Sequence, residues 1–77
     1  MTTGLVLVKL VPGKEKQALA RIKKINGVKG VTGTFGSWDA IATVAGKNLE
    51  TLAQVVVGRI RGVNGVKNTE TLIEVKI

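Results

Sequence analysis

The fold of this 77-residue chain is decided by a short segment that occurs twice, as Ile25-Asn26-Gly27-Val28-Lys29 and as Val63-Asn64-Gly65-Val66-Lys67. A Gly-Lys pair precedes each copy, at residues 13–14 and 46–47, and an apolar run precedes each pair. Asn-Gly is a strong turn signal, so each half of the chain is interpreted as strand, helix, turn and strand. The repeat therefore predicts the element order βαββαβ.

Apolar residues recur at helical spacing between each Gly-Lys pair and its Asn-Gly turn. Residues 14–25 place four of them on one face: Ala18, Leu19, Ile22 and Ile25. A longer apolar stripe runs through residues 48–62 and ends at Val63. It consists of Leu49, Leu52, Ala53, Val56, Ile60 and Val63. This spacing predicts two amphipathic helices, and Asn48 is a suitable N-cap for the second.

Four apolar or alternating runs are predicted to be strands: residues 5–11, 30–35, 40–45 and 69–77. The short connection at residues 36–39 makes the second and third strands a hairpin. Together with the helices, they predict an α+β, ferredoxin-like fold: a four-stranded antiparallel sheet with two helices on one face.

The first predicted strand is apolar on both faces, although the two helices can cover only one of them. Leu5 and Leu7 point to one face, whereas Val6 and Val8 point to the other. A chain of this length rarely buries enough surface alone, and without Cys it cannot form a disulfide. We therefore expect a second copy to cover the open face, giving a homodimer packed sheet to sheet.

The composition excludes several classes of protein. Without Cys or His, the chain has no Cys/His zinc site and no Ser-His or Cys-His catalytic pair. Apolar runs reach four residues at most, and the N-terminus lacks a signal-peptide pattern, so a cytoplasmic protein without a membrane span is expected.

Only five acidic residues are present, and Asp39 and Glu70 are the pair considered for chemistry. Two carboxylates can bind a metal or act as acid and base, but no His, Cys or Tyr accompanies them. We therefore expect no enzyme, no catalytic residue, no metal and no cofactor. The single Trp, Trp38, lies in the hairpin turn, where it could cap the sheet, anchor an interface or form the wall of a ligand site.

Twelve Lys and Arg against five Asp and Glu give a formal net charge of +7. Many of these cations fall on the predicted helices and are interpreted mainly as a solvated surface. A nucleic-acid-associated accessory protein is nevertheless one alternative, because such surfaces attract phosphate backbones. A dimeric αβ-barrel enzyme is a weaker alternative, which rests on fold analogy alone.

Two segments resemble a known family. Residues 31–41, Val-Thr-Gly-Thr-Phe-Gly-Ser-Trp-Asp-Ala-Ile, resemble the Gly-x-aromatic-Asp hairpin in the effector domain of the Lrp/AsnC regulators, with Trp38 replacing the more usual Tyr. Residues 60–71 are similar to the closing pattern of that domain, which ends in Thr-x-Thr. The chain begins directly at the first strand, so it resembles a stand-alone effector-binding (RAM) domain without the helix-turn-helix.

The resemblance implies a non-enzymatic, amino-acid-binding regulatory domain that modulates transcription or metabolism. It implies homodimers with an αβ-sandwich or barrel core, which assemble further and bind effectors in clefts between dimers. It also implies association with itself or with full-length Lrp/AsnC regulators, and no direct sequence-specific DNA binding. One wall of the site would be Gly36, Ser37, Trp38 and Asp39, with the Asp39 carboxylate receiving the ammonium group of the amino acid. A neighbouring subunit would contribute Thr69, Glu70 and Thr71.

Overall fold

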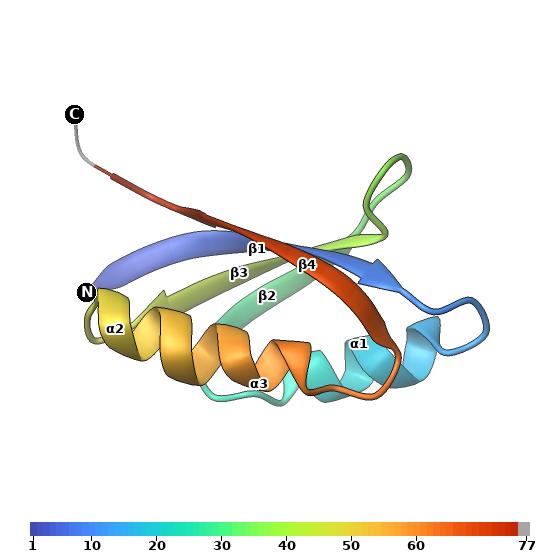
Figure 1. Cartoon of the computed structure of the whole chain (residues 1–77), viewed down its shortest axis with the longest axis horizontal. Helices are drawn as coiled ribbons and strands as arrows, with labels where there is room; N and C mark the ends of the chain where they lie inside the picture. Colours follow the sequence, from blue (N-terminus) through green and yellow to red (C-terminus); the bar gives the residue numbers. More distant parts are fainter. Residues whose placement is uncertain (76–77) are drawn as a thin grey trace.

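The computed structural model describes residues 1–75 and has the predicted order of strands and helices (Figure 1). The strands are β1 (Thr2–Leu10), β2 (Val28–Gly33), β3 (Ala40–Gly46) and β4 (Val66–Ile73). The first helix is α1 (Glu15–Lys23). The second is one continuous rod of three segments: α2 (Leu49–Thr51), the π-helical η1 (Leu52–Val57) and α3 (Gly58–Arg61). The expected ferredoxin-like fold is confirmed.

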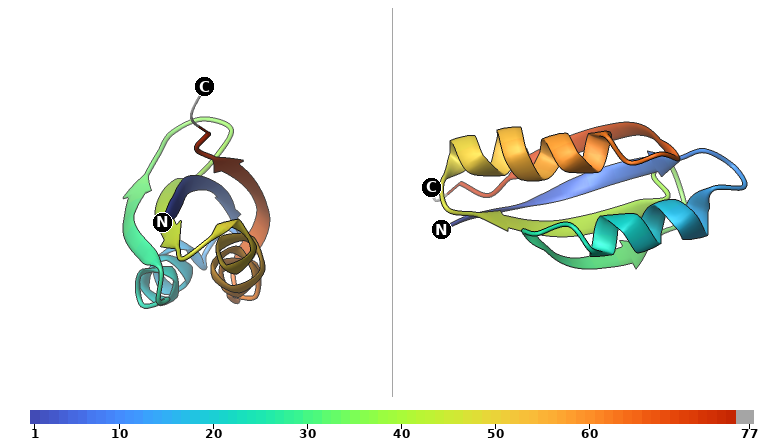
Figure 2. Two further views of the ribbon diagram at one scale, coloured as in Figure 1. Left: turned by 90° about the vertical axis from the view of Figure 1, so that its left-hand side faces the viewer. Right: turned by 90° about the horizontal axis from the view of Figure 1, so that it is seen from below.

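The four strands form one antiparallel sheet in the order β2-β3-β1-β4. β1 is central and pairs with β3 on one side and with β4 on the other, so that Val8 lies opposite both Ala40 and Thr69. Both helices pack against the same face of this sheet, side by side (Figure 2). No helix within residues 1–75 is long and apolar enough to cross a membrane.

Several predicted strand boundaries were wrong, mostly because the turns are tighter than expected. β4 begins at Val66 instead of residue 69, and β2 at Val28 instead of residue 30, since Gly65 and Gly27 turn the chain directly into each strand. β1 begins at Thr2 instead of residue 5. β2 ends at Gly33, which leaves Phe35 in the hairpin loop, and β4 ends at Ile73; residues 76–77 of the predicted last strand lie outside the described residues.

The second helix begins at the predicted cap, where the Asn48 side chain accepts a hydrogen bond from the Thr51 backbone N–H at 2.8 Å. The π-helical turns of η1 were not predicted, because the apolar residues were matched to the α-helical period alone. The predicted stripe is right in part: Leu52 and Ile60 are completely buried, and Val56 nearly so. Leu49 and Ala53 of the stripe are exposed instead, and Val57, which was not in it, is buried.

The core lies between the helices and one face of the sheet. Val6, Val8 and Leu10 of β1 point into it, together with Ile22 of α1 and Ala42 of β3. The opposite face carries no helix, and there Leu5 and its partner across the strands, Leu72, remain 40% and 48% exposed. The face predicted to remain uncovered is therefore open in the single chain.

Gly27 permits the close contact between the end of α1 and the second helix. Its φ is +103°, and a Cβ at this position would lie 2.6 Å from Cγ2 of Val56 and 3.0 Å from the Ala45 carbonyl oxygen. Gly13 has a similar φ of +89° but meets nothing within 4 Å. An alanine at Gly13 would therefore strain only the backbone, whereas an alanine at Gly27 would strain the backbone and also overlap with Val56.

We expect Gly13→Ala to destabilise the fold by about 1–2 kcal/mol, through the left-handed backbone alone. Gly27→Ala should cost roughly 1–3 kcal/mol more, since the added methyl group also overpacks the core. Urea unfolding of both variants measures the difference. Equal free energies of unfolding would show that the Gly27–Val56 contact does not constrain the packing.

Candidate functional site

The hairpin between β2 and β3 projects beyond the end of the sheet (Figure 1), and hydrogen bonds hold its base. The Thr34 backbone N–H donates to the Asp39 carbonyl oxygen at 3.0 Å, and the Thr34 hydroxyl donates to the Trp38 carbonyl oxygen at 2.7 Å. Lys9 of β1 donates from Nζ to the Ser37 carbonyl oxygen at 2.9 Å. The predicted wall from Gly36 to Asp39 is thus a loop tied to the central strand.

Asp39 attaches this hairpin to β1 through both its backbone and its side chain. Its N–H donates to the Val8 carbonyl oxygen at 2.9 Å, and its Oδ2 accepts from the Leu10 N–H at 2.8 Å. Leu10 lies beyond the last β1–β3 backbone pair, at the point where the register between β1 and β4 shifts. One carboxylate oxygen therefore continues the ladder between the strands, a structural role that the sequence did not reveal.

The Thr-x-Thr segment lies on the other side of β1 from the hairpin strand. In successive rows across the sheet, Thr69 lies opposite Val8, Glu70 opposite Leu7, and Thr71 opposite Val6. The two threonines are half-buried on the helix side, whereas Glu70 is exposed on the open side. A cavity of about 200 Å³ beside Thr69 is lined by residues 61 and 66–69 and by none of the hairpin.

Within one chain, β1 therefore separates the two predicted halves of the site. The hairpin is joined to the end of β1, and Thr69 and Thr71 belong to the edge strand beyond it. The contribution of the Thr-x-Thr segment by another subunit stays a prediction.

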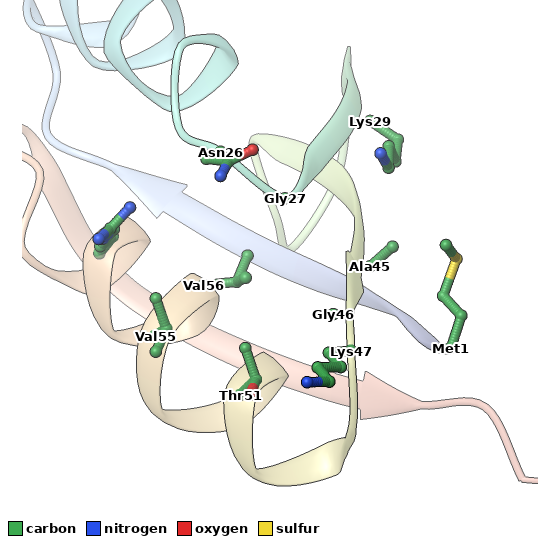
Figure 3. Close-up of a pocket in the computed structure, with 11 residues that line it drawn as sticks. Met1, Asn26, Gly27, Lys29, Ala45, Gly46, Lys47, Thr51, Val55 and Val56 are labelled. Carbon is green, nitrogen blue, oxygen red and sulfur yellow. The ribbon is translucent and has the colours of Figure 1, made fainter.

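A cavity of about 530 Å³, which the sequence did not indicate, lies at the opposite end of β3 from the hairpin (Figure 3). It is bounded by the turn after α1, the first residues of β2, the end of β3 and the second helix. Its lining includes three cations: Lys29, Lys47 and Arg59. The sequence offers one signal for this cavity: a lysine follows a glycine closely at two places, in Gly27-Val28-Lys29 and in Gly46-Lys47. Both segments were interpreted only as parts of the repeated turn pattern.

A four-stranded antiparallel sheet with two helices on one face defines a ferredoxin-like domain. The family is identified by sequence. Residues 3–77 match the family model described as Lrp/AsnC ligand binding domain, and the chain belongs to this family.

Among its relatives is an HTH-type transcriptional regulator of Pyrococcus furiosus, 32% identical over 75 residues. The match covers 94% of this chain and 50% of that protein, so the chain spans about half the length of such relatives.

Solved structures agree with this assignment. A Thermus thermophilus protein superposes with a TM-score of 0.90 at 30% identity, covering 100% of this chain and 96% of that one. A Neisseria meningitidis transcriptional regulator, solved as a complex with L-Met, has the same fold, with a TM-score of 0.82 at 14% identity. Its match covers 97% of this chain and 50% of that one.

Two substitutions test whether the hydrogen bond between the Asp39 side chain and the Leu10 N–H stabilises the fold. Asp39→Ala removes the acceptor for the Leu10 N–H and should lower the free energy of unfolding by about 1–3 kcal/mol. Asp39→Asn keeps an oxygen at that place and should cost less than half as much. Chemical denaturation of both variants checks this order; equal losses would mean that the hydrogen bond to Leu10 does not stabilise the hairpin.

Proposed function

We propose that residues 1–77 form one non-enzymatic, amino-acid-responsive regulatory domain that acts in the cytoplasm. The observation that carries this proposal is the match of the Lrp/AsnC ligand-binding family to nearly the whole chain. The relatives are transcriptional regulators of twice the matched length, so the domain would act on transcription or metabolism through assembly, with itself or with full-length regulators. It would not read DNA sequence directly.

Assembly would begin at the open face of the sheet. Leu5 and Leu72 lie opposite each other there, and together with Thr43 they line a shallow hollow of about 310 Å³. Exposed apolar side chains in a hollow favour burial against a matching surface, and a second copy provides that surface by symmetry. The result would be a homodimer whose core is closed between two sheets.

Dimers would assemble further through the projecting hairpins. Phe35 of this loop is fully exposed, and Trp38, three residues further on, is half-buried, so the loop presents aromatic surface to the outside. Aromatic side chains are enriched at protein interfaces. A neighbouring subunit that meets this hairpin would bring its own Thr69–Thr71 segment to it.

The amino acid would bind between these two halves. The negative charge of Asp39 would attract the ammonium group, because only one of its oxygens is used by the Leu10 N–H in the hydrogen bonds of the described residues. Backbone N–H groups of Gly36 and Ser37, with the hydroxyls of Thr69 and Thr71 from the neighbour, would receive the carboxylate, and Glu70 would border the cleft. The L-Met complex of the Neisseria meningitidis regulator supports a ligand of this class.

A thermal-shift panel of the twenty amino acids at about 10 mM tests this proposal. At least one should raise the Tm, because a ligand at 100 times its Kd stabilises the folded state by about 2.7 kcal/mol. Asp39→Asn should abolish the shift in Tm, because it removes the negative charge, but it should keep an oxygen that accepts the hydrogen bond from the Leu10 N–H. Glu50→Gln removes the same charge from an exposed helix start and should keep the shift.

If no amino acid raises the Tm of the unmodified chain, amino-acid sensing is wrong. If Asp39→Asn responds like the unmodified chain, the ammonium role of Asp39 is wrong, while sensing by the domain stands.

A further inference from the structure

The cavity between the turn after α1 and the second helix has the chemistry of an anion site. Lys29 comes from β2, Lys47 from the loop after β3, and Arg59 from α3, so three separate elements each bring a cation to it. No acidic residue of the described chain lines it, and its uncharged polar side chains are Asn26 and Thr51. Cations gathered without a carboxylate repel one another, and an anion at their centre relieves that repulsion.

One wall of the same cavity is apolar. Val55 and Val56 of η1 line it together with Ala45 of β3, and Val55 remains 40% exposed although it is a large hydrophobic residue. Figure 3 shows Thr51, Val55 and Val56 on the helix, whereas Ala45 and Lys29 extend from the side of β3 and β2 that is away from the helix. A hydrated inorganic anion has no apolar part that could contact this wall, whereas an organic anion has one.

The helix is π-helical where it forms this wall. Residues Leu52–Val57 make up η1, and both valines of the wall lie within it. π-helical turns are rare and occur frequently at functional sites, because the widened turn presents side chains that a regular α-helix would space differently. Close approach of Gly27 to Val56 holds the turn after α1 against this part of the helix.

We propose that this cavity is a second ligand site, which binds a small organic anion: a phosphate or carboxylate head group held by Lys29, Lys47 and Arg59, with an apolar body against Val55. The volume of about 530 Å³ is within the range of small-molecule sites. The site shares no residue with the Gly36–Asp39 hairpin or with Thr69–Thr71. Its lining also includes none of Leu5, Thr43 and Leu72, which line the hollow on the open face.

Isothermal titration calorimetry with four probes tests the proposal at low ionic strength, because salt screens such contacts. Hexyl phosphate and hexanoate carry both an anionic head and an apolar body, inorganic phosphate has only the head, and 1-hexanol has only the body. At least one of the first two should bind about tenfold or more tightly than either half-probe. Whichever of them binds more tightly identifies the head group.

Three variants locate the binding. Lys47→Gln with Arg59→Gln should weaken binding of the tighter probe about tenfold or more. Lys23→Gln with Lys24→Gln, two exposed lysines of α1 and its end that do not line the cavity, makes the same change of net charge and should leave binding unchanged. Val55→Ser should weaken binding of hexyl phosphate but not of inorganic phosphate.

Equal weakening by the two double variants would overturn the proposal, since it would show only general attraction to a basic protein. Absence of binding by both hexyl probes would overturn it as well. Asp39→Asn should bind the hexyl probe normally, so failure of this site and failure of the amino-acid site are distinguishable. A Tm close to that of the unmodified chain shows that each variant is folded.

Discussion

The central strand β1 is apolar on both faces, and the rest of the structure depends on how those faces are covered. Val6, Val8 and Leu10 are buried under the two helices, which forms the core of the single chain. Leu5 and Leu7 point the other way, and in the single chain Leu5 remains substantially exposed. One strand thus drives folding through one face and, in the proposed homodimer, would drive association through the other, because burial of apolar surface is the main favourable term in both processes.

The ends of β1 and β3 position the two candidate ligand sites. At one end, Asp39 fastens the hairpin to Leu10, so the loop that would hold an amino acid is built onto the central strand. At the other, Gly27 and Gly46 let the turn after α1 and the end of β3 come close to the second helix, and the basic cavity opens between them. The seven residues of β3 separate the two places, so the two proposed sites would not overlap.

Much of the fold could be predicted from sequence because its signals are local. The repeated Asn-Gly turns gave the βαββαβ order, the stripe of Leu52, Val56 and Ile60 identified the buried helix face, and Asn48 was recognised as a cap. The strand ends at Val28 and Val66 were missed because a glycine turn and the following strand overlap in composition. The π-helical turns were missed because the apolar residues were matched to the α-helical period alone, which places Ala53 and not Val57 on the buried face.

The candidate site was less accessible to sequence reasoning. The hairpin and Thr-x-Thr segments stood out through resemblance, but the bond from Asp39 to Leu10 joins residues 29 positions apart and depends on strand register. The cavity with Lys29, Lys47 and Arg59 combines three distant parts of the chain, so no single motif contains it.

The most direct measurement of pairing through the open face is the solution mass by sedimentation equilibrium at about 100 μM, where a stable homodimer is fully formed. The unmodified chain should have at least twice its 8.1 kDa mass. Leu72→Arg should reduce that mass towards 8.1 kDa, whereas Leu49→Arg, at a similarly exposed leucine on the second helix, should not. A mass of 8.1 kDa for the unmodified chain, or an unchanged mass for Leu72→Arg, would contradict pairing through the open face.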